Sequence, residues 1–253
     1  MDRLLKGIPA SPGIAVGTVH LLLWEVPDVP HHIIKDSEIA SETTRLHQAI
    51  GRAKERLLHV RDRVEKTAGK EEAMIFDAQY HILEDPALLT GVEELIKQNL
   101  AAEKAFDLEM LEWRQRWSRH TSAMVLERVS DLTDIHIRVL AILLELPDHD
   151  PVDLPKGAKA VLVTHDLTPG LTVQLDREAI VGIATDAGTR TSHVAILARS
   201  LGLPAVVGLR SATDHLRGHE NVILDGTAGL IVINPSNTDI EKYRDRARDE
   251  EIP

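Results

Sequence analysis

The fold is decided by residues 179–208, which read AIVGIATDAGTRTSHVAILARSLGLPAVVG. An apolar run rich in Ile and Val comes first, and a loop that contains Gly188 follows it. A helical stretch then leads through Gly202 into a second apolar run. Strands that alternate with helices in this way are typical of an α/β protein, and here the order places His193 on the first turn of a helix.

Further strands are predicted on both sides of this stretch. Apolar runs at 160–164, 222–225 and 230–234 are rich in Val and Ile and are bounded by Gly, Pro and Asp. Residues 4–24 contain a short stretch in which apolar and polar residues alternate, which predicts one or two strands. Because so short a segment is not stable by itself, we expect it to join the later sheet.

Between these α/β parts the apolar residues recur with helical spacing. Ser37 is a suitable N-cap for a first helix that ends near Gly69, and Asp85 followed by Pro86 is a cap and first-turn pair for a third. The other expected helices cover 71–83, 103–127 and 131–146. No glycine lies between Gly91 and Gly157, which favours a compact bundle of long helices.

These patterns predict two domains, of which one is interrupted by the other. The α/β domain is expected to consist of residues 1–24 and 148–235, and the inserted helical domain of residues 33–146. Residues 236–253 are expected to form a charged linker helix.

Composition limits the classes of function. The 253 residues include no Cys, and 29 Lys and Arg stand against 40 Asp and Glu, which gives a net charge of −11. Disulfides and thiolate sites are therefore excluded, and the acidic balance argues against nucleic acid as the main partner. No apolar run approaches the roughly 20 residues that span a bilayer, and the N-terminus lacks a signal peptide's apolar stretch. We expect a cytoplasmic protein without a membrane partner.

The charge is distributed unevenly along the helical part. Residues 45–70 contain eight bases and three acids, whereas residues 71–112 contain eleven acids and two bases. An ordinary solvated helix face is one explanation of such a run. The size of the imbalance nevertheless makes 71–112 the best place for a basic partner.

One of the thirteen histidines stands apart from the others. His193 follows a strand and a glycine-containing loop, and either Thr191 or Ser192 is placed to cap the helix that it begins. Free backbone N–H groups at a helix start and the neighbouring Arg190 favour a phosphate-sized anion. Because an imidazole is a competent nucleophile toward phosphorus, the pattern predicts reversible phosphorylation of His193, with simple helix capping as the alternative. No CxxC or HExxH motif is present, and we predict no metal site.

A second capped helix follows a neighbouring strand. In the sequence DLTP (166–169), Thr168 is placed to be the N-cap and Pro169 the first helical residue. Because both helices follow strands of the same sheet, we expect Thr168 to lie close to His193. Its hydroxyl would then hydrogen-bond either the imidazole ring or the phosphoryl group, unless it is a plain helix cap.

Four segments together resemble the N-terminal portion of enzyme I, the phosphoenolpyruvate–protein phosphotransferase of the bacterial sugar phosphotransferase system. They are GIPASPGIAVG (7–17), ILEDP (82–86), DLTP (166–169) and TDAGTRTSHVAILARSLGLPAVVG (185–208). The resemblance implies a swivelling phosphohistidine domain, split by a helical domain that docks the small carrier protein HPr. It implies that His193 is phosphorylated, and we expect support from five residues: Thr168, Arg190, Thr191, Ser192 and Arg199.

The resemblance also implies what to expect of partners and cofactors. HPr presents a basic surface, so we expect it to dock on the acidic segment, with Glu71, Glu72, Glu84 and Asp85 as candidates. In the family, phosphoenolpyruvate and Mg²⁺ bind a C-terminal (β/α)₈ barrel, and no cofactor is expected in this chain. The sequence ends at Pro253, about where the family's linker leads into that barrel. We therefore expect this chain to exchange phosphate with phospho-HPr but not with phosphoenolpyruvate. We also expect it to be a monomer.

The sequence departs from the family pattern at one position of the loop. The family usually has two glycines before the basic residue, and here the second is Thr189. If this position required a positive φ, a threonine would be strained and the loop would be shaped differently.

Three other interpretations remain open at this point. The chain is also compatible with the phosphohistidine domain of a dikinase or phosphoenolpyruvate synthase, although the helical insertion is not expected there. A paralogous enzyme I of the nitrogen or dihydroxyacetone-kinase branch would share the same motifs. A non-catalytic interaction module is the alternative from another class.

Overall fold

The computed structural model describes residues 4–250 except 123–124, 126–127, 147–153 and 155–156. The chain divides into two compact units. The α/β unit contains residues 1–24, 150–167 and 175–253, and the helical unit contains residues 25–149 and 168–174. Compared with the predicted ranges, residues 25–32 and 168–174 group with the helical unit, and residues 236–253 group with the α/β unit. The expected boundary at 148 lies outside the described residues.

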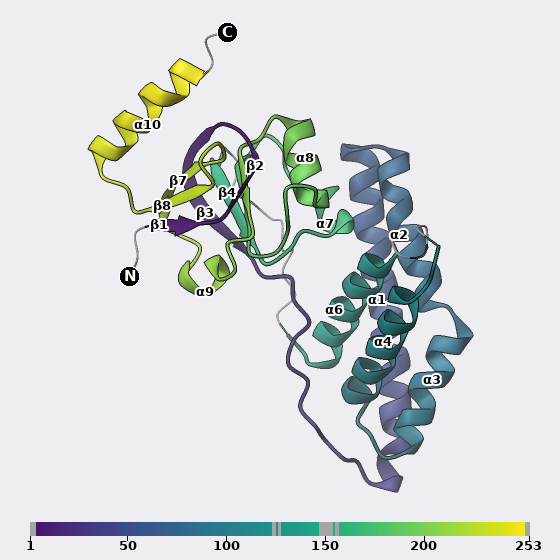
Figure 1. Ribbon diagram of the computed structural model, residues 1–253. Coiled ribbons are helices and arrows are strands. Elements are labelled where there is room, and N and C mark those ends of the chain that lie inside the picture. The colour runs from purple at the N-terminus through teal and green to yellow at the C-terminus, as the bar shows by residue number, and fades with distance from the viewer. Residues whose placement is uncertain (1–3, 123–124, 126–127, 147–153, 155–156, 251–253) are drawn as a thin grey trace. The chain divides into compact units, whose positions relative to one another are not determined.

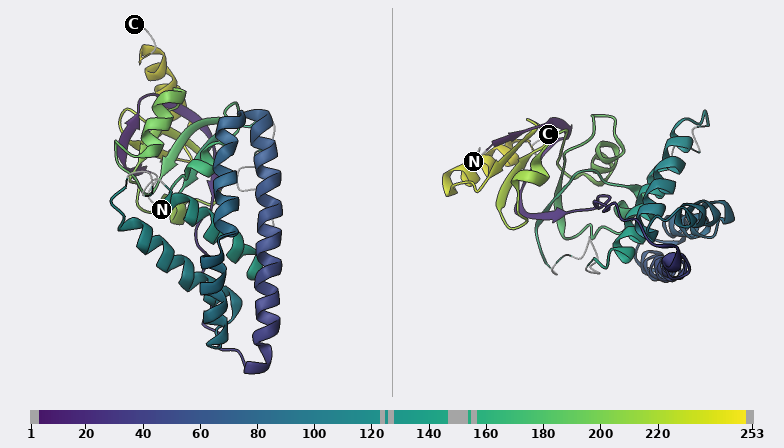
Figure 2. Two further views of the ribbon diagram at one scale, coloured as in Figure 1. Left: turned by 90° about the vertical axis from the view of Figure 1, so that its right-hand side faces the viewer. Right: turned by 90° about the horizontal axis from the view of Figure 1, so that it is seen from below.

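The helical unit is built from helices joined by short connections. Its described elements include a 3₁₀ turn Asp36–Glu38, α1 Ile39–Thr67, α2 Lys70–Leu83, α3 Pro86–Lys97, α4 Ala102–Ser118, α6 Val129–Leu143 and the single-turn α7 Pro169–Thr172. Figure 2 shows α2 alongside the longer α1, to which the two-residue connection 68–69 joins it.

Two details of the expected helices are corrected. Ser37 lies inside the 3₁₀ turn, and Glu38 stands at the N-cap of α1 without a side-chain capping hydrogen bond. The helix expected over 103–127 is interrupted: α4 ends at Ser118 and residues 119–122 are not helical, whereas Val125 is helical again. The cap of α3 is confirmed, because Asp85 accepts a hydrogen bond of 2.8 Å from the N–H of Ala87.

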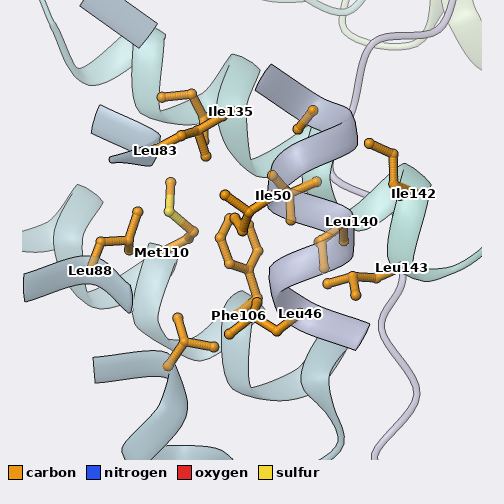
Figure 3. Close-up of a cluster of buried hydrophobic side chains, with 14 of the residues drawn as sticks. Leu46, Ile50, Leu83, Leu88, Phe106, Met110, Ile135, Leu140, Ile142 and Leu143 are labelled. Carbon is orange, nitrogen blue, oxygen red and sulfur yellow. The ribbon is translucent and has the colours of Figure 1, made fainter. Parts of the chain in front are cut away.

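Apolar side chains from five helices form the core of the helical unit. Figure 3 shows them converging on the ring of Phe106, which is fully buried. The labelled members are Leu46, Ile50, Leu83, Leu88, Phe106, Met110, Ile135, Leu140, Ile142 and Leu143. Burial of this apolar surface is the main force that holds α1 to α4 and α6 together.

The α/β unit contains an eight-stranded mixed sheet (Figure 1). Its strands are β1 Leu4–Lys6, β2 Ile8–Ser11, β3 Ile14–Leu22, β4 Ala160–Thr164, β5 Ile180–Thr185, β6 Ala205–Val207, β7 Asn221–Asp225 and β8 Leu230–Ile233. They lie in the order β1-β8-β7-β3-β4-β5-β6-β2, and the four strands from β3 to β6 are parallel. The N-terminal segment therefore joins the later sheet, as expected.

The first two strands form the two edges of this sheet. β1 pairs with β8 and β2 pairs with β6, yet only Gly7 separates them in the sequence. The two edges of the sheet must therefore meet at this residue, and the sheet curls toward a closed barrel. A side chain at Gly7 would not fit, since a Cβ there would lie 2.6 Å from the carbonyl oxygen of Val207.

In the described part of this unit, three helices accompany the sheet. They are α8 His193–Leu201, the single-turn α9 Ala212–His215, which was not predicted, and α10 Asn237–Glu250. α8 packs against β2 and β6 through Val194, Ala195 and Ala198. Among the described residues no helix has the length and apolar character required to cross a membrane.

Candidate active site

The loop that precedes α8 is fixed at its beginning by the backbone. It leaves β5 at Thr185, and the N–H groups of Asp186 and Ala187 donate to the carbonyl oxygens of Thr164 and His165 at 3.1 and 2.9 Å. The carboxylate of Asp186 accepts hydrogen bonds from two backbone N–H groups at the start of α9. The loop thus starts from a rigid point at the carboxyl end of two parallel strands.

Gly188 supplies the conformation that the loop requires. Its φ is +104°, and a Cβ at this position would lie 3.1 Å from the Oγ of Ser192. Thr189 is not among the residues with positive φ. The threonine that replaces the family's second glycine is therefore not strained at φ. The loop need not be distorted to accommodate it.

His193 is the first residue of α8, as predicted. Ser192 is the N-cap, and its Oγ accepts a hydrogen bond of 3.4 Å from the N–H of Ala195. The imidazole of His193 is exposed to solvent. Among the described residues, the backbone N–H groups of residues 188–191, His193 and Val194 have no hydrogen-bond acceptor. Two of these six donors, the N–H groups of His193 and Val194, lie in the first turn of α8, where the positive end of the helix dipole suits an anion.

The predicted supporting residues of this loop fall into two groups. Arg190 and Thr191 are exposed, and the Thr191 hydroxyl lies 3.3 Å from that of Thr189. Arg199 instead donates to the carbonyl oxygens of Ala10 and Arg190, at 2.8 and 3.1 Å. The Arg199 guanidinium therefore ties α8 to β2 and to the loop. Among the described residues, the side chain of Arg190 forms no such hydrogen bond.

Two further cations adjoin the loop and were missed by sequence reasoning. Lys6 and Arg210 line a shallow hollow of about 510 Å³, together with Asp186 and Gly188. Arg210 has a φ of +73°, which is unusual for a residue other than glycine. No local motif marks either residue, because they come from β1 and from the connection after β6.

Thr168 lies in the helical unit, whereas His193 lies in the α/β unit. It caps α7 as predicted, and its Oγ1 accepts a hydrogen bond of 3.2 Å from the N–H of Leu171. The hydroxyl donates to the carboxylate of Asp134, with distances of 2.9 and 3.1 Å to Oδ1 and Oδ2. The expected proximity of Thr168 to His193 stays a prediction.

Asp134 belongs to a buried polar cluster on α6 that sequence reasoning missed. The amide Nε2 of Gln79 donates to Asp134 and to Asp131, at 3.2 Å in each case. All three side chains are buried, and burial raises the pKa of Asp131 above its ordinary value. The available signal was the pair of acids, three residues apart, on a helix whose other buried residues are apolar apart from His136.

The chain superimposes on a known structure over almost its whole length. The NMR solution structure of an enzyme I protein (nEIt) matches with a TM-score of 0.82 and 34% identity, over 98% of this chain and 99% of that one. The chain belongs to the enzyme I family.

Other relatives of this enzyme I chain agree with that assignment. Phosphoenolpyruvate-protein phosphotransferases from Staphylococcus carnosus and Geobacillus stearothermophilus are 34% and 36% identical over 97% of this chain, which spans 42% of their length. Residues 6–128 match the family described as PEP-utilising enzyme, N-terminal, and residues 156–229 match the PEP-utilising enzyme mobile domain. The N-terminal domain of a nitrogen-branch enzyme 1 shares the fold, with a TM-score of 0.58 and 24% identity.

The acidic segment of this enzyme I chain is not one solvated face. Three of its acids on α4, Glu103, Asp107 and Glu109, are buried. Four acids of the segment, Glu103 among them, are paired with residues of α1: the pairs are Arg45–Glu103, His47–Glu93, Lys54–Glu84 and Arg61–Asp77. Much of the excess of acids between 71 and 112 is therefore balanced by the excess of bases between 45 and 70. We therefore correct the interpretation that the whole segment 71–112 forms one docking face.

The four acidic docking candidates differ in how much charge they present. The Lys54 ammonium holds the pKa of Glu84 below its ordinary value through a hydrogen bond of 2.7 Å. Asp85 is half-buried and serves as the cap of α3. Glu71 and Glu72 are exposed on the first turn of α2, and among the described residues no ion pair is formed by either. These two remain the best candidates.

Proposed function

We propose that this chain is a phosphoryl-transfer protein of the bacterial sugar phosphotransferase system, in which His193 accepts a phosphoryl group and passes it to a histidine of HPr. The observation that carries this proposal is the exposed imidazole of His193 at the start of α8, beside six backbone N–H groups without acceptors among the described residues. Membership of the enzyme I family supports it. We expect the protein in the cytoplasm, where HPr would meet it.

The transfer is an exchange between two imidazoles. The N–P bond on the donor histidine breaks while an N–P bond forms on an unprotonated nitrogen of His193. The other ring nitrogen of His193 keeps its proton, so the new phosphoimidazole carries a positive ring charge that needs an acceptor for that N–H. The donors of the loop and the side chain of Arg190 would stabilise the phosphoryl oxygens as they move. Thr191, Ser192 and Arg199 would hold the loop in place.

Mass spectrometry of the phosphorylated chain tests this function. After incubation with phospho-HPr and handling in alkali, the wild type should carry an acid-labile adduct of about 80 Da, which His193→Ala should lack. His219→Ala, which removes another exposed histidine of the same unit, should retain it. Absence of the adduct from the wild type would refute phosphorylation and favour a non-catalytic interaction module.

We propose that the phosphoryl group originates from phosphoenolpyruvate, which the names of the curated relatives state for those proteins. Phosphoenolpyruvate and Mg²⁺ would bind outside the residues of this chain, as in the barrel that the family resemblance implies. The chain alone should therefore show no adduct when it is mixed with phosphoenolpyruvate and Mg²⁺. An adduct in that mixture would place the phosphoenolpyruvate site within these 253 residues.

HPr is proposed to dock on the exposed start of α2. Met74 is 59% exposed and lies three residues after Glu71, so the two side chains are neighbours on the helix surface. An apolar side chain beside acids suits a partner whose histidine is surrounded by basic residues. The acids would mainly raise the association rate.

Charge reversal on α2 tests the docking surface. At low salt, reversing both Glu71 and Glu72 to Lys should slow association with HPr about tenfold, and the difference should shrink as salt is added. Glu65→Lys, the same charge change on an exposed position of α1, is the matched control. If the double variant and the control associate equally fast with HPr at low salt, the docking surface lies elsewhere.

A further inference from the structure

Thr189 and Thr191 form a pair of neighbouring hydroxyls on the loop that precedes α8. Their Oγ1 atoms lie 3.3 Å apart, and both side chains are exposed. Each hydroxyl has one proton, so the hydrogen bond between them uses one of the two protons. Among the described residues no acceptor is bonded to the other proton. The pair therefore has one O–H left to donate.

The backbone holds Thr189 against the start of α8. The N–H of Ser192, the N-cap, donates to the carbonyl oxygen of Thr189 at 3.0 Å and closes a tight turn over 189–192. A Cβ on the neighbouring Gly188 would lie 3.1 Å from the Oγ of Ser192, so the chain approaches the cap closely. Because His193 follows Ser192 directly, Thr189 stands beside the helical turn that carries the imidazole.

Arg199 holds the same turn from a second side. Its Nη2 donates to the carbonyl oxygen of Arg190 at 3.1 Å, and its Nη1 donates to that of Ala10 in β2 at 2.8 Å. A loop that is fixed before a ligand arrives loses little conformational entropy when the ligand binds. The two hydroxyls are therefore pre-organised for a group that binds at the start of α8.

A phosphoryl group on His193 would supply the acceptor that the pair lacks. Its anionic oxygens accept hydrogen bonds, and charge-assisted hydrogen bonds are about twice as strong as those between neutral groups. The enzyme I family usually has glycine at position 189, but the φ of Thr189 is not positive, so the backbone does not demand glycine there. What the threonine adds at this position is a hydrogen-bond donor.

We propose that Thr189 is a phosphoryl-binding residue: its hydroxyl donates to a phosphoryl oxygen on His193, while the hydroxyl of Thr191 donates to Oγ1 of Thr189 and fixes its rotation. The inference rests on the proposed function, because it requires that His193 carry a phosphoryl group. Thr189 makes or breaks no bond to phosphorus. Its hydrogen bond stabilises phosphorylated His193, so it shifts the exchange with phospho-HPr toward this chain.

The equilibrium of phosphoryl exchange with HPr tests this role. In Thr189→Val, the ratio of phosphorylated His193 to phospho-HPr should fall about fivefold, the size expected for one lost hydrogen bond. Thr189→Ser keeps the hydroxyl and should restore the wild-type ratio. Thr238→Val removes an exposed hydroxyl from α10 of the same unit and should leave the ratio unchanged. A wild-type ratio in Thr189→Val would overturn the proposal.

Two further measurements separate Thr189 from its partner and from support of the fold. Thr191→Val should lower the ratio less than Thr189→Val does, because it removes only the orienting contact; a larger fall would make Thr191 the donor and overturn the proposal. Phosphorus NMR of phosphorylated His193 should show an altered chemical shift in Thr189→Val and the wild-type shift in Thr189→Ser. An unaltered shift in Thr189→Val would overturn the proposal even if the ratio fell. Failure of the proposed function is recognised separately, by a wild type that acquires no phosphoryl group from phospho-HPr.

Discussion

His136 is expected to make the stability of the helical unit depend on pH. The imidazole is fully buried on α6, and its Nε2 lies 3.0 Å from Oδ1 of Asp107. Burial lowers the pKa of His136 to about 4, although the nearby Asp107 opposes the shift and Arg114 adds to it. In the unfolded chain the same group titrates near its ordinary value of about 6.5.

The sign and size of the effect follow from this difference. Between about pH 6.5 and pH 4 the unfolded chain binds a proton that the folded chain does not bind, so the free energy of unfolding falls as the pH falls. Stability from this group is complete above pH 6.5. The loss should be about 2 kcal/mol at pH 5 and about 3 kcal/mol below pH 4.

Urea unfolding at pH 7.5 and pH 5.0 measures this loss. Trp113 is buried in the helical unit and donates to Glu109, so tryptophan fluorescence reports the unfolding of α4. Burial raises the pKa of Asp131 and of Glu109, and these carboxyls change stability in the opposite direction. The comparison therefore needs a variant that lacks only the titrating imidazole.

His136→Gln supplies that comparison, because a glutamine amide keeps a donor near Asp107 and does not titrate. Between pH 7.5 and pH 5.0 the wild type should lose about 2 kcal/mol more than this variant. Equal losses in the two proteins would show that His136 is protonated as readily in the fold as in the unfolded chain, and would refute the reasoning.

Three further predictions concern the folded structure. Gly170→Ala should lower the thermal midpoint of the helical unit, because its Cβ would lie 2.4 Å from Oδ2 of Asp134. Gly51→Ala should raise that midpoint, because nothing lies within 4 Å of a Cβ there and alanine favours a helix. Equal shifts of the midpoint in the two variants would count against the close approach at Gly170. Asp85→Ala should cost about 1 kcal/mol in urea unfolding through loss of the α3 cap, and no change would mean that the cap is dispensable. Phe106→Ala should cost about 3–5 kcal/mol by the same measurement, and a loss below about 1 kcal/mol would contradict its central place in the core.

The candidate phosphorylation site could be located from sequence because its parts are local. Ser192 caps the helix that His193 begins, and both are set by contacts within a few residues of the loop. The caps at Asp85 and Thr168 were predictable for the same reason. Capping depends on hydrogen bonds over two or three residues, so a short motif contains all the information that it needs.

The distribution of charge could not be predicted in this way. A count along the chain separates a basic segment from an acidic one, but α1 and α2 pack side by side, and pairs such as Lys54–Glu84 cancel much of the difference. Burial of Glu103 and Asp107 removes more. Neither effect is visible without knowledge of which helix faces which.

By itself, the sequence determined the fold class, the capped helix that carries His193 and the resemblance to enzyme I, since each depends on local patterns. Tertiary structure alone decided that the strands on either side of Gly7 form opposite edges of one sheet, and that α7 packs with the helical unit. It also decided that Asp134, which is 34 residues from Thr168 along the chain, takes the hydroxyl proton of that threonine. Contacts of this kind depend on the packing of whole elements, because a buried polar group must find its partner wherever the fold brings one within reach.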